Sequence, residues 1–174
     1  IADFLDIKNK NTTKLFDKKF SIIKNINDNE KCEIFLSFNQ SEKSSLISFC
    51  NTIATPDGGS HENGFKNGIL KAIKLYGQKN QVSKISNISI NDLIDYSDII
   101  ISIFINEPSF EGQTKKRIIM PKLQKQLESI IQNEFLLWLN SNKKISKILI
   151  EALIERSLLR SDLTKIRELE RKSF

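Results

Sequence analysis

Residues 110–117 carry the residue types that bind an anion. They read Phe-Glu-Gly-Gln-Thr-Lys-Lys-Arg, with a glycine near the middle and three consecutive cations at the end. Gly112 lets a backbone approach a ligand closely. Lys115 offers a compact, mobile ammonium of the kind that proteins use on phosphates. The segment predicts a phosphate-binding loop, and a basic loop that is only solvated is the alternative.

A strand and a helix must hold this loop between them. Residues 98–106 form an Ile-rich run that is apolar on both faces, which predicts a strand in the centre of a sheet. Pro121 opens a helical pattern that ends near residues 140–142, with apolar positions spaced along one face. The loop therefore follows the end of a central strand and precedes a long amphipathic helix.

The other segments predict an α+β domain. We expect strands at 20–24, 32–38 and 46–53, joined by short turns into an antiparallel meander. Helical patterns cover 61–79, a short stretch from Ser89 through Tyr96, and the chain from about 143 onward. The expected fold is a sheet of about four strands with helices on one face and a long C-terminal helix, whose part from Arg160 onward either projects from the domain as a connector or pairs with another helix.

Composition limits the class of protein. The 174 residues include 39% hydrophobic and 28% charged residues, as in a globular domain, and the net charge of +6 weakly favours an acidic partner such as a nucleotide or nucleic acid. No apolar run approaches the length of a membrane span, and no leader pattern is present, so we expect a cytoplasmic protein. The chain begins at Ile1 rather than at a methionine, which suggests a piece of a longer protein.

Cysteine and histidine usage argues against a metal site. Cys32 and Cys50 lie in apolar runs, and neither has a Cys or His at ligand spacing, so we expect buried reduced thiols and no metal. His61, the only histidine, follows Gly58-Gly59. It could act as a general base, but with no neighbouring nucleophile it is better suited to ordering that glycine loop. The two glycines could bind phosphate or simply shape the turn.

Three stretches resemble the B subunits of bacterial type IIA topoisomerases. Residues 49–66 are similar to the family segment N-T-I-x-T-P-x-G-G-[ST]-H-x-x-G-[FL]-[RK], and 102–115 to S-V-x-x-x-x-P-x-F-x-G-Q-T-K. Residues 168–173 resemble the charged helix end that precedes the family's Toprim domain. The amino-acid sequence at 51–56 resembles that of topoisomerase IV B subunits more than that of gyrase B subunits. The family's D-V-R-E-G is replaced at 92–96, where the Arg and Gly are missing.

The resemblance implies a transducer domain with a ribosomal protein S5 domain 2-like fold. On this basis residues 1–18 end a linker helix from an upstream ATP-binding domain, 19–142 form the transducer domain, and 143–174 form a helix leading to a Toprim domain. The domain would couple ATP binding and hydrolysis to DNA strand passage. The isolated segment is not expected to hydrolyse ATP or to cleave DNA.

The resemblance also implies roles for individual residues. Lys115 matches the family lysine that touches the γ-phosphate of ATP, and Gln113 matches its partner in the same loop. Lys66 and Lys71 match basic positions that face DNA, where a solvated helix face is an equal alternative. The implied cofactors are ATP with Mg²⁺, bound mainly by the upstream domain, and the Mg²⁺ of the Toprim domain. The implied partners are double-stranded DNA, the topoisomerase A subunit and a second B subunit on ATP binding.

Two other functions fit the same residues. A nucleic-acid-binding module could use an S5-like fold and its basic surface without nucleotide chemistry. A purely structural dimerisation segment would need no role for Lys115 at all.

Overall fold

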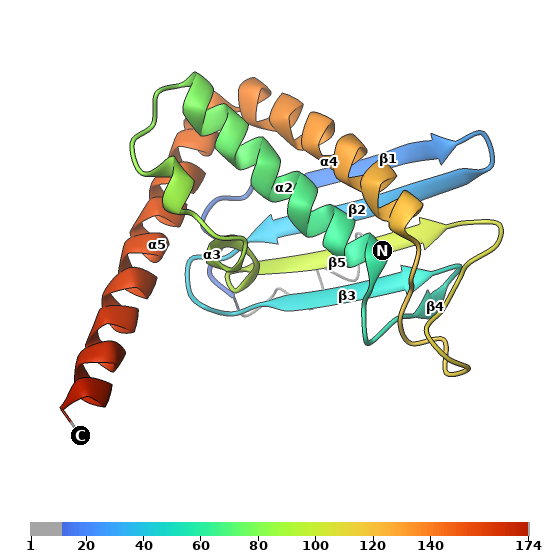
Figure 1. Cartoon of the computed structure of the whole chain (residues 1–174). Helices are drawn as coiled ribbons and strands as arrows, with labels where there is room; N and C mark the ends of the chain where they lie inside the picture. The colour runs from blue at the N-terminus through green and yellow to red at the C-terminus, as the bar shows by residue number, and fades with distance from the viewer. Residues whose placement is uncertain (1–11, 174) are drawn as a thin grey trace.

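The computed structural model describes residues 12–173, so residues 1–11 of the helix end expected at 1–18 lie outside the described residues. Figure 1 shows one sheet covered by helices. The elements, in chain order, are β1 (Phe20–Asn27), β2 (Glu30–Phe38), β3 (Ser45–Cys50), β4 (Ile53–Ala54), α2 (Ser60–Lys79), η1 (Ile85–Asn87), α3 (Asn91–Ile94), β5 (Ser97–Phe104), α4 (Pro121–Ser141) and α5 (Lys143–Lys172).

The strand order corrects the predicted meander. The five-stranded sheet has the order β1-β2-β5-β3-β4, in which β5 lies between β2 and β3, antiparallel to β2 and parallel to β3. Seven of the eight residues of β5 are buried, and a strand with two apolar faces is stable only in the interior of a sheet. A meander would have placed β3 beside β2 and left β5 at an edge. The fifth strand, β4, has only two residues.

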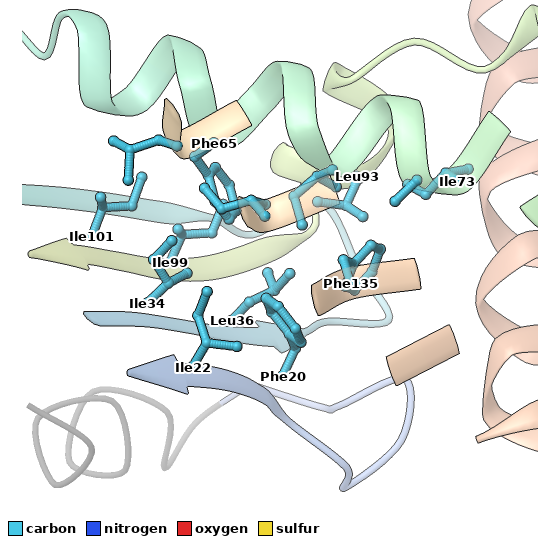
Figure 2. Packing of buried hydrophobic residues seen from close by; sticks show 14 of the residues in the cluster. Phe20, Ile22, Ile34, Leu36, Phe65, Ile73, Leu93, Ile99, Ile101 and Phe135 are labelled. Carbon is cyan, nitrogen blue, oxygen red and sulfur yellow. The ribbon is translucent and has the colours of Figure 1, made fainter. Parts of the chain in front are cut away.

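The core lies between the sheet and the helix pair α2 and α4. Figure 2 shows Phe65 of α2 and Phe135 of α4 gathered with strand residues such as Ile34 and Ile99. All four side chains are fully buried, as the alternating pattern of β2 and the helical spacing of α2 and α4 predict. The helices therefore cover one face of the sheet, as expected from the sequence.

Two glycines let α2 and α4 approach closely. A Cβ on Gly64 would lie 2.7 Å from the carbonyl oxygen of Gln124, and one on Gly68 would lie 2.8 Å from that of Glu128. Both obstacles are backbone atoms, which cannot turn aside as a side chain can. The α2–α4 pair is therefore a tightly packed unit, and each of its helices begins next to the loop that carries Lys115.

The last part of α5 extends away from the sheet (Figure 1). Every residue from Leu158 to Ser173 is exposed, which confirms the expected projection. Sequence reasoning missed how the helix is attached. Arg156 lies over the Tyr96 ring, 3.7 Å from its centroid, and donates to the backbone oxygens of Asp92 and Asn39 at 3.1 and 3.0 Å. Among residues 12–173, no helix is long and apolar enough to cross a membrane.

The side chain of Asp92 joins α3 to α5. Its carboxylate accepts hydrogen bonds from the Arg160 guanidinium at 3.0 and 3.1 Å and from the backbone N–H of Ser89 at 2.8 Å. The spacing of Ser89 and Asp92 resembles a capping box, in which the later side chain bonds back to the earlier N–H, as observed here. No sequence pattern indicated the link to Arg160.

Replacing Asp92 by alanine is expected to lower the free energy of unfolding by about 1–3 kcal/mol, because it removes the charge-assisted hydrogen bonds that this buried carboxylate accepts from Arg160 and Ser89. Urea denaturation of the 174-residue chain measures this loss. Asp95→Ala is the matched control, since the Asp95 side chain makes no hydrogen bond or ion pair within residues 12–173. Equal stability of the two variants would contradict the proposed link.

Candidate functional site

The connection from β5 to α4 forms a projecting loop with a paired base. The N–H of Ile119 donates to the carbonyl of Ser109 at 3.0 Å, and the N–H of Glu111 donates to that of Arg117 at 2.8 Å. Residues 111–116, between these pairs, are all exposed. The predicted anion-binding residues therefore stand on the tip of a short hairpin-like loop.

A second segment clamps the base of this loop. The N–H of Asp57 donates to the carbonyl of Lys116 at 3.0 Å, and the N–H of Ile118 donates to that of Gly58 at 3.0 Å. The N–H of Ser60 completes the pairing by donating to the carbonyl of Ile118 at 3.0 Å. The loop thus lies beside the turn that leads from β4 into α2, as can be followed in Figure 1. The two longest motifs of the sequence are in direct contact.

Gly59 lies at the centre of this contact. Its φ is +123°, and a Cβ there would lie 2.1 Å from the carbonyl oxygen of Ile118. Glycine is required here both by the backbone conformation and by the close approach of the second segment. The Gly58-Gly59 pair therefore allows two backbone segments to lie in close contact. This supports the role of shaping the turn, which the sequence offered as the alternative to phosphate binding.

Lys115 and Gln113 are exposed at the loop tip. Lys115 has a φ of +56°, a left-handed conformation that is uncommon for a residue with a side chain. Its ammonium makes no ion pair or hydrogen bond with residues 12–173, so its charge is free to meet a ligand. Gly112 also has a positive φ, +72°, and no atom lies within 4 Å of where its Cβ would be.

Arg117 has a structural function that the sequence did not indicate. Its guanidinium contacts the Glu111 carboxylate at 3.3 Å and donates to the carbonyl of Asp57 at 3.1 Å. The side chain joins both halves of the loop base to the turn before α2. The sequence predicted only a cation in a basic run, because nothing local marks Asp57 as its neighbour.

A buried polar chain runs beneath the turn. His61 Nε2 lies 2.8 Å from Thr55 Oγ1, which lies 2.7 Å from Ser48 Oγ. Ser48 Oγ in turn lies 2.7 Å from Glu62 Oε1. A carboxylate can only accept, so Ser48 donates to Glu62, Thr55 donates to Ser48, and His61 Nε2–H donates to Thr55. This direction of donors places a proton on Nε2 of His61.

The environment of His61 opposes its protonation. Burial lowers the pKa of His61 from 6.5 to about 4, and the ring is fully buried. Its Nδ1 has no hydrogen-bond partner among the described residues. A histidine without solvent access cannot exchange protons with a substrate. The contacts therefore favour the ordering role for His61 over the general-base role.

Lys66 and Lys71 occupy different environments on α2. The Lys71 ammonium pairs with the Glu128 carboxylate on α4, and this hydrogen bond is the main cause that lowers the pKa of Glu128. Lys66 is half-buried and has no ion pair within residues 12–173. Part of the positive charge of Lys71 is therefore neutralised within the domain, whereas that of Lys66 is not.

The two thiols are buried and unbonded, as the sequence predicts. Burial raises the pKa of both Cys32 and Cys50 to about 11, so neither is a reactive thiolate. In the part of the chain that the structure describes, no three His, Cys, Asp or Glu side chains are arranged to hold a metal ion.

Comparison with known proteins identifies the family. The family model described as DNA gyrase B matches residues 1–169. The B subunit of DNA topoisomerase 4 from Rickettsia conorii is 34% identical over 152 residues, which cover 87% of this chain and 23% of that protein. The chain thus spans about a fifth to a quarter of the length of the curated relatives that it matches.

Two solved structures share the fold. The topoisomerase IV ATP-binding domain of Francisella tularensis, in complex with a small-molecule inhibitor, is 29% identical with a TM-score of 0.78 and covers 90% of this chain and 42% of its own. The 43K ATPase domain of Thermus thermophilus gyrase B, in complex with an aminocoumarin, has a TM-score of 0.84 at 23% identity. The match covers 97% of this chain and 46% of the chain in that structure. The chain therefore belongs to the DNA gyrase B family, which includes B subunits of topoisomerase IV and of gyrase.

Proposed function

We propose that this chain is the transducer segment of an ATP-dependent type II DNA topoisomerase B subunit. The observation that carries the proposal is the exposed, unpaired ammonium of Lys115 on a loop whose base is bonded to the start of α2. In this role Lys115 contacts the γ-phosphate of ATP, with Gln113 beside it. The two structural relatives are an ATPase domain and an ATP-binding domain, which supports a nucleotide partner for this chain.

The contact with phosphate provides a physical basis for coupling. Charge develops on the phosphoryl oxygens during transfer to water, and a fixed cation stabilises it. A charge-assisted hydrogen bond of this kind is worth about 1.5–3 kcal/mol. Since the terminal phosphate leaves after hydrolysis, the contact exists in one nucleotide state only. A differential contact of this kind can shift the equilibrium between two domain orientations.

The rest of the assignment is proposed from the resemblance to the family. Residues 1–18 would end a helix from an ATP-binding domain, 19–142 would form an S5 domain 2-like transducer, and 143–174 would lead to a Toprim domain. ATP with Mg²⁺ would be held mainly by the upstream domain, and a second Mg²⁺ by the Toprim domain. DNA, an A subunit and a second B subunit are the proposed partners, in the cytoplasm. The likeness to the Rickettsia conorii protein favours topoisomerase IV over gyrase.

Lys66 and Lys71 are proposed to face the DNA. Contacts of this kind with phosphates are independent of sequence and weaken as salt is added. Lys66 is the better candidate of the two, because Lys71 already shares its charge with Glu128.

The substitution Lys115→Ala separates this function from a nucleic-acid-binding module. In the intact B subunit that carries this segment, we expect the variant to lose ATP turnover while its affinity for DNA and the salt dependence of binding stay unchanged. In a binding module, the same variant would weaken DNA binding. The slope of the logarithm of the binding constant against the logarithm of salt concentration would fall by about one unit. DNA titrations at several salt concentrations, with ATPase assays on the same preparations, decide between the two. A purely structural segment would leave both properties unchanged.

A further inference from the structure

The turn of residues 57–60 is hydrogen-bonded to residues 116–118, the segment that directly follows Lys115 in the loop. We propose that this turn is the positioning element of Lys115, with Gly59 and Ser60 as positioning residues, an inference that rests on the proposed role of Lys115. The N–H of Asp57 holds the carbonyl of Lys116, the residue next to Lys115. No side chain separates the two segments at this point, so the position of the turn sets that of the loop.

Gly59 controls how closely the two segments approach. A Cβ at this position would lie 2.1 Å from the carbonyl oxygen of Ile118 and 2.7 Å from its nitrogen. Both atoms belong to the backbone, so an added methyl group must push residues 116–118 away rather than displace a side chain. The φ of +123° at Gly59 adds to the strain. Any displacement is passed to Lys115, which directly precedes this segment.

Ser60 fixes the other end of the same segment. Its N–H donates to the carbonyl of Ile118 at 3.0 Å, and its hydroxyl accepts a hydrogen bond from the N–H of Met120 at 2.7 Å. Ser60 is buried and is the first residue of α2, whereas Met120 precedes the first residue of α4. One residue therefore holds both the segment that follows Lys115 and the start of α4.

Buried contacts keep the turn itself in place. The N–H of Gly58 donates to the carbonyl of Thr55 at 2.9 Å, and the Thr55 hydroxyl belongs to the buried chain that contains His61. The turn is thus anchored to β3 and α2, both parts of the core. Precise anchoring matters because a misplacement of about 1 Å at a reacting centre can lower a rate about 10²-fold.

The test compares Gly59→Ala, Ser60→Ala and Ser60→Thr in the intact B subunit, each alone and combined with Lys115→Ala. Single-turnover ATP hydrolysis, nucleotide affinity and melting temperature are measured for every variant. We expect Gly59→Ala to lower the rate about 10²-fold and Ser60→Ala about tenfold, with the nucleotide still bound. Ser60→Thr, which keeps the hydroxyl, restores the rate. Asn63→Ala, an exposed position in the first turn of α2, is the control without effect.

The double variants show whether the turn acts through Lys115. If it does, neither Gly59→Ala nor Ser60→Ala lowers the rate further once Lys115 is absent. An equal loss in both backgrounds, or full activity of both single variants beside an inactive Lys115→Ala, would overturn the positioning role alone. Full activity of Lys115→Ala would instead reject the proposed function. Should Gly59→Ala fail to fold, the Ser60 pair decides the question.

Discussion

Replacing Lys115 by alanine is expected to lower ATP turnover about 10³-fold in the intact B subunit. A cation that stabilises the transition state of phosphoryl transfer is worth about 10³–10⁵ in rate, and a lysine of a second domain belongs at the lower end. The nucleotide should still bind, because most of its contacts would come from the ATP-binding domain. Steady-state ATPase with nucleotide binding measured on the same protein checks both statements.

The matched control for this variant is Lys116→Ala. It removes the same charge one residue further along, where the side chain is exposed and makes no ion pair within residues 12–173. We expect turnover within a factor of about two of the wild type, since an exposed charge contributes little. Equal losses in the two variants would mean that the loop acts only through its overall charge. Unchanged turnover of Lys115→Ala would remove the basis for the assigned role.

Acidification is expected to destabilise the chain through His61. The unfolded chain binds a proton at His61 below about pH 6.5, whereas the folded chain binds it only near pH 4. The unfolded state therefore holds more protons in this interval, and stability falls as the pH is lowered. The full contribution of His61 to the free energy of unfolding is present above pH 6.5. About 3 kcal/mol is lost by pH 4, since each pH unit is worth about 1.4 kcal/mol.

The variant His61→Gln isolates this effect. Glutamine can still donate to Thr55 but does not titrate, and His61 is the only histidine of the chain. Urea denaturation at several pH values should give a difference between wild type and variant that changes by about 3 kcal/mol between pH 6.5 and 4. A difference that does not depend on pH would show that the folded chain binds the proton as readily as the unfolded chain.

Much of the fold follows from patterns that are local in sequence. The alternation from Cys32 to Phe38 and the helical spacing from Phe65 to Tyr76 each predict which side chains are buried, and the structure confirms them. Periodicity reports the face that a segment turns to the core. It does not report which strand lies beside another. The central position of β5 was therefore predicted and is confirmed, whereas its two neighbours, β2 and β3, were not predicted.

The candidate site was predicted in part for the same reason. The residue types at the tip of the loop are visible in the sequence, because glycine and lysine have distinctive properties. The residues that hold the base of the loop are not visible in the sequence. Asp57 and Arg117 are far apart along the chain, and the pairing of β5 with β3 in the sheet brings them together. The pairing of Lys71 with Glu128 likewise depends on how α2 and α4 cross. The juxtaposition of the two longest family motifs is the one signal that could have indicated a shared site.

The central claim is that Lys115 contacts the terminal phosphate in one nucleotide state only. The direct test is the rate at which an amine-modifying reagent labels Lys115 in the intact B subunit, followed by mass spectrometry. The account predicts protection of Lys115 by a non-hydrolysable ATP analogue but not by ADP, with Lys116 labelled at the same rate in both. Equal labelling of Lys115 in the two nucleotide states would contradict it.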